Sequence, residues 1–285
     1  MSEKGKSNVK VMPIVRKPHF NWEGMPLHYV ENNYFGTHFL NSMHVVFPEG
    51  EKFFIRSVKA FVDKIEDPNL KERVKAFIGQ EAQHMALHKT FWQKLQDDGP
   101  ALEIFEKIYS ATAFDFLEKI SRALSRDKYS LSVTAALEHY TAILAEVVFE
   151  KDSEILDGIP EEMVKMLKWH AAEEIEHKAV AFDVLKTVDD SYLLRVSGMI
   201  FATYGLVFYI LMGQAIFMAL DKQIPFWDMP GQFLRFAEKA APIFTAAARE
   251  VADYFRPNFH PDDKDNISIA KEYFAKVEEE LKAAV

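Results

Sequence analysis

The chain has 285 residues, with 34 Lys and Arg against 43 Asp and Glu, a net charge of −9 and no cysteine. This length supplies enough side chains for a sizeable buried core. The acidic balance argues against nucleic acid as a partner, because phosphate binding needs clustered Lys and Arg. The lack of cysteine excludes disulfide scaffolds, thiolate zinc sites and iron–sulfur clusters. A metal would therefore have to be held by nitrogen and oxygen ligands.

The sequence indicates an all-α fold, and no segment shows a convincing strand alternation. Residues 1–45 are rich in aromatic residues, Pro and Asn without a sustained period, which predicts an extended N-terminal arm. Residues 46–190 are expected to form a helical bundle, and residues 191–285 an apolar helix and shorter helices of the same domain. Helices are predicted over residues 48–66, 70–96, 101–124, 129–150, 161–187, 196–220 and 267–284, and the prolines between 225 and 257 are expected to separate short helices.

Two features bear on localisation. The basic N-terminus is followed by no apolar run, so a secretory signal is not indicated and a cytoplasmic protein is expected. Residues 196–220, however, contain no charged residue and are long enough to cross a membrane. This segment is either a helix buried on all sides or a membrane contact, and the sequence leaves both interpretations open.

The predicted helices carry polar residues on their apolar stripes. In the helix over 48–66, the stripe of Phe54, Val58 and Val62 extends back to Glu51. The stripes of the next three long helices are likewise interrupted by carboxylates and imidazoles. These residues are Glu81 and His84, then Glu138, then Glu174 and His177.

Several carboxylates that face one interior need positive charge, because an isolated buried carboxylate is costly. Two Glu-x-x-His pairs on separate helices, with one Glu from each of two others, form the ligand set of a dinuclear carboxylate bundle. We therefore predict a centre for two metal ions. Mixed carboxylate and imidazole ligands favour iron, with manganese and zinc as alternatives.

Three acidic residues adjacent to these motifs are not assigned to the ligand set. Glu49 is an alternative to Glu51, but only Glu51 is in register with the stripe. Glu173 and Glu176 face about 100° away from their sequence neighbours, so we interpret them as solvated charges.

Further histidines lie near the motifs. His139 is off its stripe and is not expected to be a ligand. His88, one turn after His84, is interpreted as a core histidine or as a group that hydrogen-bonds a ligand. His170 precedes Glu174 by one turn on the same face, which makes it a candidate seventh ligand.

The chain also resembles a known bacterial family. The segments PHFNWEG, FPEGEKFF, FIGQEAQHMALH, AALEHYTA, WHAAEEIEHKAVAFDV and YFRPNFHPDD are similar to proteins described as predicted metal-dependent hydrolases. The resemblance extends from about Pro18 to Asp265 and implies a ferritin-like fold. The spacing of His170, Glu174 and His177 is also similar to that in the di-iron arylamine N-oxygenases.

Three functions remain open from the sequence. The one we favour is oxygen activation by a di-iron or di-manganese centre for oxidation of an apolar or aromatic small molecule. It would require an electron-donor protein as partner. A metal-dependent hydrolase that uses a metal-activated water is the second, and a non-catalytic metal-binding protein the third. The sequence does not specify catalytic residues beyond the metal centre, a further cofactor, the substrate or the oligomeric state.

Overall fold

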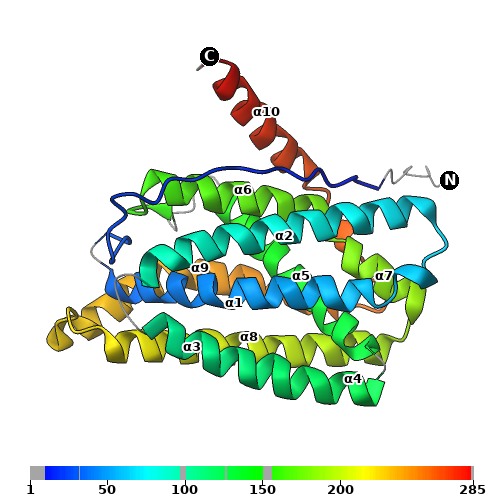
Figure 1. Ribbon diagram of the computed structural model, residues 1–285, viewed down its shortest axis with the longest axis horizontal. Coiled ribbons are helices and arrows are strands. Elements are labelled where there is room, and N and C mark those ends of the chain that lie inside the picture. Colours follow the sequence, from blue (N-terminus) through cyan, green and yellow to red (C-terminus); the bar gives the residue numbers. More distant parts are fainter. Residues whose placement is uncertain (1–9, 32, 97–100, 126, 150–155, 284–285) are drawn as a thin grey trace.

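The computed structural model describes residues 10–31, 33–96, 101–125, 127–149 and 156–283, and no strand occurs among them. The predicted all-α fold is confirmed. In the view of Figure 1, α2 and α6 lie above α1 and α5, while α3, α4 and α8 form the lower edge. The N-terminal segment runs along the upper side of the bundle, and α10 projects from the same side.

Four long helices carry all the predicted metal ligands. They are α1 (Tyr34–Lys59), α2 (Pro68–Gln96), α5 (Lys128–Phe149) and α6 (Glu161–His177). Helix α1 packs against α2, and α5 against α6. Their apolar stripes meet in the bundle interior, where Phe77 and Leu131 are fully buried. The packing of these stripes determines which side chains reach the centre.

The first helix differs at both ends from the one expected over 48–66, and it already ends at Lys59. The first helix begins at Tyr34 instead of Pro48, so residues 34–45 belong to α1 and not to the arm. The Asn33 side chain caps its first turn by accepting from the Gly36 amide. Pro48 lies inside the helix, where its ring lacks the amide hydrogen of a regular turn. The predicted start at Pro48 was therefore wrong.

The helix expected over residues 161–187 is two helices. Helix α6 ends at His177, and α7 (Val180–Val188) follows after a break at Lys178. The Lys178 side chain turns away to donate to the Asn266 side chain and the Lys264 carbonyl. The break therefore falls immediately after the last predicted ligand. The predicted end of α5 at Glu150, the first nine residues of the arm and the last residue of the C-terminal helix lie outside the described residues.

The segment between α2 and α5 is helical but irregular. It comprises α3 (Ala101–Tyr109), a nine-residue π-helix η2 (Ser110–Glu118) and α4 (Lys119–Ser125). Wide π-turns are rare in proteins and occur frequently at functional sites. Four residues of this π-helix, Ala113, Phe114, Leu117 and Glu118, line a cavity.

The uncharged segment lies in α8 (Tyr192–Leu220), which packs against α1 and α5. Close approach is possible at Gly198, where an added Cβ would lie 2.0 Å from the Ser132 hydroxyl oxygen. The opposite side of α8 is exposed, for example at Leu193 and Tyr204, so the helix is not buried on all sides. By length and composition alone, α5 and α8 are apolar enough to cross a membrane, but a helix in a soluble core can pass the same test.

The C-terminal part follows α8. After η4 (Phe226–Asp228), α9 (Met229–Tyr254) is one continuous helix, so the expectation of short helices separated by prolines was wrong there. After η5 (Pro261–Asp263), α10 (Ile267–Ala283) packs against α6. The remaining short element, η1 (Val62–Lys64), joins α1 to α2.

Candidate metal centre

The seven predicted ligands come together in the interior of the four-helix bundle. All are buried: Glu51, Glu81, His84, Glu138, His170, Glu174 and His177. Their ligand atoms form overlapping groups in which every atom lies within 4.8 Å of the others. The helices contribute as the stripes predict, with one Glu each from α1 and α5 and a Glu-x-x-His pair each from α2 and α6.

The distances define two neighbouring positions. At one, His177 Nε2 lies 3.1 Å from Glu81 Oε1, 3.3 Å from Glu138 Oε2 and 3.2 Å from Glu174 Oε2. At the other, His84 Nδ1 and His170 Nε2 lie 3.2 and 2.9 Å from Glu174 Oε1. The two oxygens of Glu174 therefore face different positions. This arrangement is suited to a carboxylate that bridges two metal ions.

Several ligand atoms are buried without a hydrogen-bond partner among the described residues. They are both carboxylate oxygens of Glu51, Glu81 and Glu138, together with His84 Nδ1. In the same part of the chain, the ion pairs of these three carboxylates are all with histidines. Orphaned buried polar atoms are costly, and buried charge needs a partner. Two divalent cations would supply that charge, so the donor set fits metal ions.

The protonation equilibria show the same deficit of positive charge. Burial, reinforced by the neighbouring Glu81, raises the pKa of Glu138 to about 8. Burial and the same neighbour raise the pKa of Glu51 well above its usual range. Although burial opposes it, hydrogen bonding to Glu173 and the negative charge of Glu174 raise the pKa of His84 to about 10. Without metal, the centre therefore retains protons that a cation would displace.

The outer nitrogen of each candidate histidine ligand has its own partner. His84 Nε2 lies 3.1 Å from Glu173, His177 Nδ1 lies 2.9 Å from the Gln80 side-chain oxygen, and His170 Nδ1 lies 3.0 Å from His88 Nε2. Such contacts fix the orientation of metal-binding imidazoles and tune their basicity. Gln80 was not identified from the sequence. Its position one residue before Glu81 was the only available signal.

The N-terminal arm supplies the positive charge that pairs with Glu173 and Glu176. Arg16 donates to Glu173 at 3.2 Å and forms two hydrogen bonds of 2.8 Å with Glu176. Glu176 also accepts from the side-chain amide of Gln80. Both carboxylates are buried, so our interpretation of Glu173 and Glu176 as solvated charges was wrong. Glu173 contacts the outer nitrogen of His84, and both carboxylates also contact the arm, whose position the helical period cannot reveal.

A chain of three histidines ends at Glu174. His44 Nδ1 lies 2.9 Å from His88 Nδ1, His88 Nε2 lies 3.0 Å from His170 Nδ1, and His170 Nε2 lies 2.9 Å from Glu174. Burial lowers the pKa of His88 well below its usual range and that of His44 to about 3, so both are neutral. His88 Nε2 also lies 3.7 Å from Glu51 Oε1, whereas His170 Nε2 lies 3.8 Å from that oxygen and 2.9 Å from Glu174 Oε1. The geometry favours His170 over His88 as a ligand. His139 contacts the Glu250 carbonyl instead and lies outside the centre.

A cavity of about 140 Å³ adjoins the centre. Glu51 is part of its wall, and most of the remaining lining is apolar, including Phe54, Tyr109 and Phe114. The π-helix and α8 close its other sides. A dry space of this kind next to a metal centre could hold an apolar molecule.

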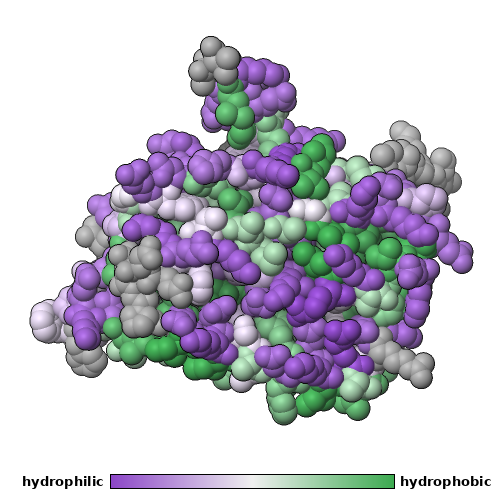
Figure 2. All heavy atoms as spheres, in the orientation of Figure 1, coloured by the Kyte–Doolittle hydropathy of each residue, from purple (hydrophilic) through white to green (hydrophobic). Residues whose placement is uncertain are grey.

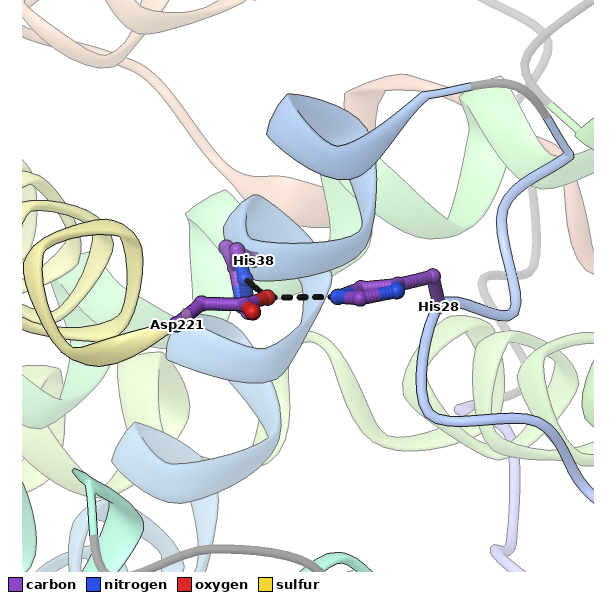
Figure 3. Close-up of side chains that lie close together, drawn as sticks. All are labelled: His28, His38 and Asp221. Atoms are coloured by element: carbon purple, nitrogen blue, oxygen red, sulfur yellow. Dashed lines mark hydrogen bonds and ion pairs between the residues drawn. The ribbon is translucent and has the colours of Figure 1, made fainter. Parts of the chain in front are cut away.

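A second cluster of potential ligands lies where the arm, α1 and the end of α8 meet. Figure 3 shows His28 and His38 on either side of Asp221, with Nε2 atoms 2.5 and 2.9 Å from the same carboxylate oxygen. The other oxygen accepts from the Gln223 amide. Although burial opposes it, hydrogen bonds led by that of His28 lower the pKa of Asp221. In contrast to the main centre, this carboxylate has partners for both oxygens, so the cluster fastens the arm without needing a metal.

The fold and the buried residues define a class: an all-α bundle protein whose Glu and His side chains are suited to hold metal ions. Within that class, the chain belongs to the family described as predicted metal-dependent hydrolases, whose model matches residues 14–265. The resemblance stated from the sequence motifs is thereby confirmed. No curated protein and no solved structure matches the chain.

Proposed function

We propose that the protein is a dinuclear non-haem metal enzyme that activates O₂ to oxidise an apolar or aromatic small molecule. The observation that carries this proposal is the group of orphaned carboxylate oxygens on Glu51, Glu81 and Glu138. Iron is the metal we propose, because the donors are oxygen and imidazole nitrogen, with manganese as an alternative. Bound there, an iron pair would supply the redox chemistry that the side chains lack.

The protein would orient the metal-binding side chains and exclude water from the centre. Glu173, Gln80 and His88 orient the three imidazoles, and the bundle excludes water from the centre. Glu51 faces both the other ligands and the cavity, so a molecule held in the cavity would lie beside the metals. These contacts support binding of the substrate at the open side of the centre.

The cavity supports an apolar substrate. Its lining offers few hydrogen-bond donors, so binding would rest on apolar contact with side chains such as Phe54 and Phe114. Insertion of one oxygen atom of O₂ into a C–H bond releases the other as water and consumes two electrons and two protons. An electron-transfer protein would have to supply those electrons, since the side chains offer no redox group. We propose such a protein as a partner.

A metal-dependent hydrolase is the second candidate, favoured by the description of the family. Two metals can generate hydroxide and polarise a carbonyl or phosphoryl oxygen. The apolar lining argues against this alternative, because a hydrolysed bond is polar and would meet few partners in the cavity.

Loading the protein with different metals distinguishes the oxygen-activating enzyme from the hydrolase. The metal-free protein is loaded anaerobically with ferrous iron, exposed to O₂ and followed by absorption and Mössbauer spectroscopy. We expect two irons per chain and conversion to a coupled diferric spectrum, with Glu174→Ala losing both properties. Failure of the iron-loaded protein to consume O₂ would refute the proposal. Hydrolysis of p-nitrophenyl butyrate by the zinc-loaded protein, lost in Glu174→Ala, would favour the hydrolase.

A further inference from the structure

An exposed apolar surface runs along one side of the molecule. We call it the apolar face. It combines one stripe of α8 with the outer side of α3, η2 and α4, which form the lower edge of the bundle, and Figure 2 shows apolar atoms gathered there. Its exposed residues are Leu193, Ile200, Phe201, Tyr204, Val207, Phe208 and Leu211 on α8, and Ile104, Ile108, Phe116, Leu117, Ile120 and Leu124 on the other helices.

The size of this face is unusual for a protein surface. Many of these side chains are about half exposed or more, with Leu124 at 83% and Leu193 at 76%. At about half of roughly 200 Å² for each large side chain, they expose on the order of 1,000 Å². The largest apolar patch of a monomeric protein is usually about 300–600 Å² and is often functional.

The cavity beside the metal centre reaches this face. Leu117 of the π-helix and Phe201 of α8 line the cavity and are themselves exposed on the apolar face. Glu51 lines the same cavity. One continuous apolar path therefore runs from the surface to a candidate metal ligand.

The volume limits what the path can hold. An empty cavity of about 150 Å³ accommodates one benzene ring, and this cavity measures about 140 Å³. A fatty acyl chain is several times longer than such a space. Its reacting segment would fit inside while the rest extended past Leu117 and Phe201 onto the apolar face.

A lipid surface fits this face better than a second copy of the chain does. A second copy packed on the face would cover Leu117 and Phe201, whereas a bilayer would present acyl chains there without their passage through water. The charge-free stretch of α8 is compatible with lipid contact. Since the other side of α8 packs against α1 and α5, the helix would lie in the membrane interface and not cross the bilayer.

We propose that the apolar face docks on a lipid bilayer and that the cavity binds an acyl chain that enters from it. The substrate class of the proposed oxidation would then be a fatty acyl compound. That part rests on the proposed function, whereas docking and chain binding do not require it.

Docking is tested by flotation of the full chain with phosphatidylcholine vesicles. We expect the wild type to float, the variant Phe208→Glu/Leu211→Glu to lose at least tenfold in bound fraction, and Leu281→Glu to behave as wild type. Leu281 is a matched control, because it is 65% exposed on α10, away from the apolar face. Circular dichroism establishes that each variant is folded. A wild type that stays unbound overturns docking, as does sedimentation that shows a dimer in the wild type and a monomer in the double variant.

Chain binding is tested with laurate by isothermal titration calorimetry. Gly205 lines the cavity, and a Cβ there meets open space, so Gly205→Leu fills the cavity without a clash. We expect this variant to lose at least tenfold in laurate affinity while vesicle flotation is unchanged. Equal affinity in both proteins overturns the assignment of the cavity. Neither measurement involves O₂, so absence of oxygen chemistry with docking and binding intact would refute only the proposed function.

Discussion

Replacement of Arg16 tests whether the arm supports the metal centre. Its guanidinium bonds Glu173 and Glu176 and lies 3.4 Å above the ring of Phe274. Through these carboxylates it is linked to His84 and, by way of Gln80, to His177. Arg16→Gln removes the cation while both carboxylates stay buried.

The expected magnitude follows from burial. Removal of one partner from a fully buried ion pair costs about 3–5 kcal/mol. The Arg16 side chain is 23% exposed, and water entering after its removal would solvate part of the charge. We therefore expect the free energy of unfolding to fall by about 2–3 kcal/mol. Metal affinity should fall by about 10–100-fold, as is usual when a group that orients a ligating imidazole is disturbed.

Two measurements check this expectation. Urea denaturation of the metal-free protein gives the change in stability, and competition with a chromophoric chelator gives the metal affinity. Lys17→Gln is the matched control, because it removes the same charge from the next residue, whose side chain is exposed. The control should alter neither quantity.

A second substitution identifies the cause of the stability loss in Arg16→Gln. If the unpaired charge of Glu176 is responsible, Arg16→Gln/Glu176→Gln should recover part of the stability lost in Arg16→Gln. Metal affinity within twofold of wild type and stability within about 0.5 kcal/mol in Arg16→Gln would refute the role of the arm, since surface substitutions typically have effects of that size.

Three other substitutions test the centre and the packing. Glu81→Gln should reduce the metal content measured by mass spectrometry from two to one or none per chain, while Glu49→Gln retains both. Asp183→Asn should lower the free energy of unfolding by about 2 kcal/mol near neutral pH. Hydrogen bonds outweigh burial and lower the pKa of Asp183 to about 2, so its contribution is present above about pH 4 and is lost as the pH falls through 2. In a urea titration at pH 2 the variant and the wild type should therefore be nearly equal. Gly213→Arg should lower the free energy of unfolding by about 3 kcal/mol or more, because an added Cβ already lies 2.7 Å from a phenylalanine ring.

The meeting of these candidate ligands could be predicted, because each is in register with the apolar stripe of its helix. Glu138 is an example: on its helix the neighbouring stripe residues are buried alanines and leucines, so a carboxylate in that register must face the interior. Four such helices, two of them with a Glu-x-x-His pair, match the ligand set of a dinuclear carboxylate bundle. The same reasoning gave the helical fold but misplaced the start of α1, because Pro48 resembled a first-turn proline although the helix runs through it.

The supporting residues could not be predicted in this way. The helical period gives the direction in which a side chain points but not what it meets there. Glu173 and Glu176 are off the apolar stripe of their helix, which on an isolated bundle would mean solvent. Here that side is covered by the arm, whose sequence has no period and whose contact with α6 bridges about 160 positions in the chain.

The charged residues on the two sides of α6 connect the arm to the candidate metal centre. Glu174 faces inward, where His84, His170 and His177 contact it, whereas Glu173 and Glu176 face outward and pair with Arg16. His84 lies between them, with one nitrogen toward Glu174 and the other toward Glu173. A change in charge on either side must therefore alter the basicity of this imidazole and so the affinity for metal. It follows that the arm influences the centre through His84 although, among its described residues, it supplies none of the candidate ligands.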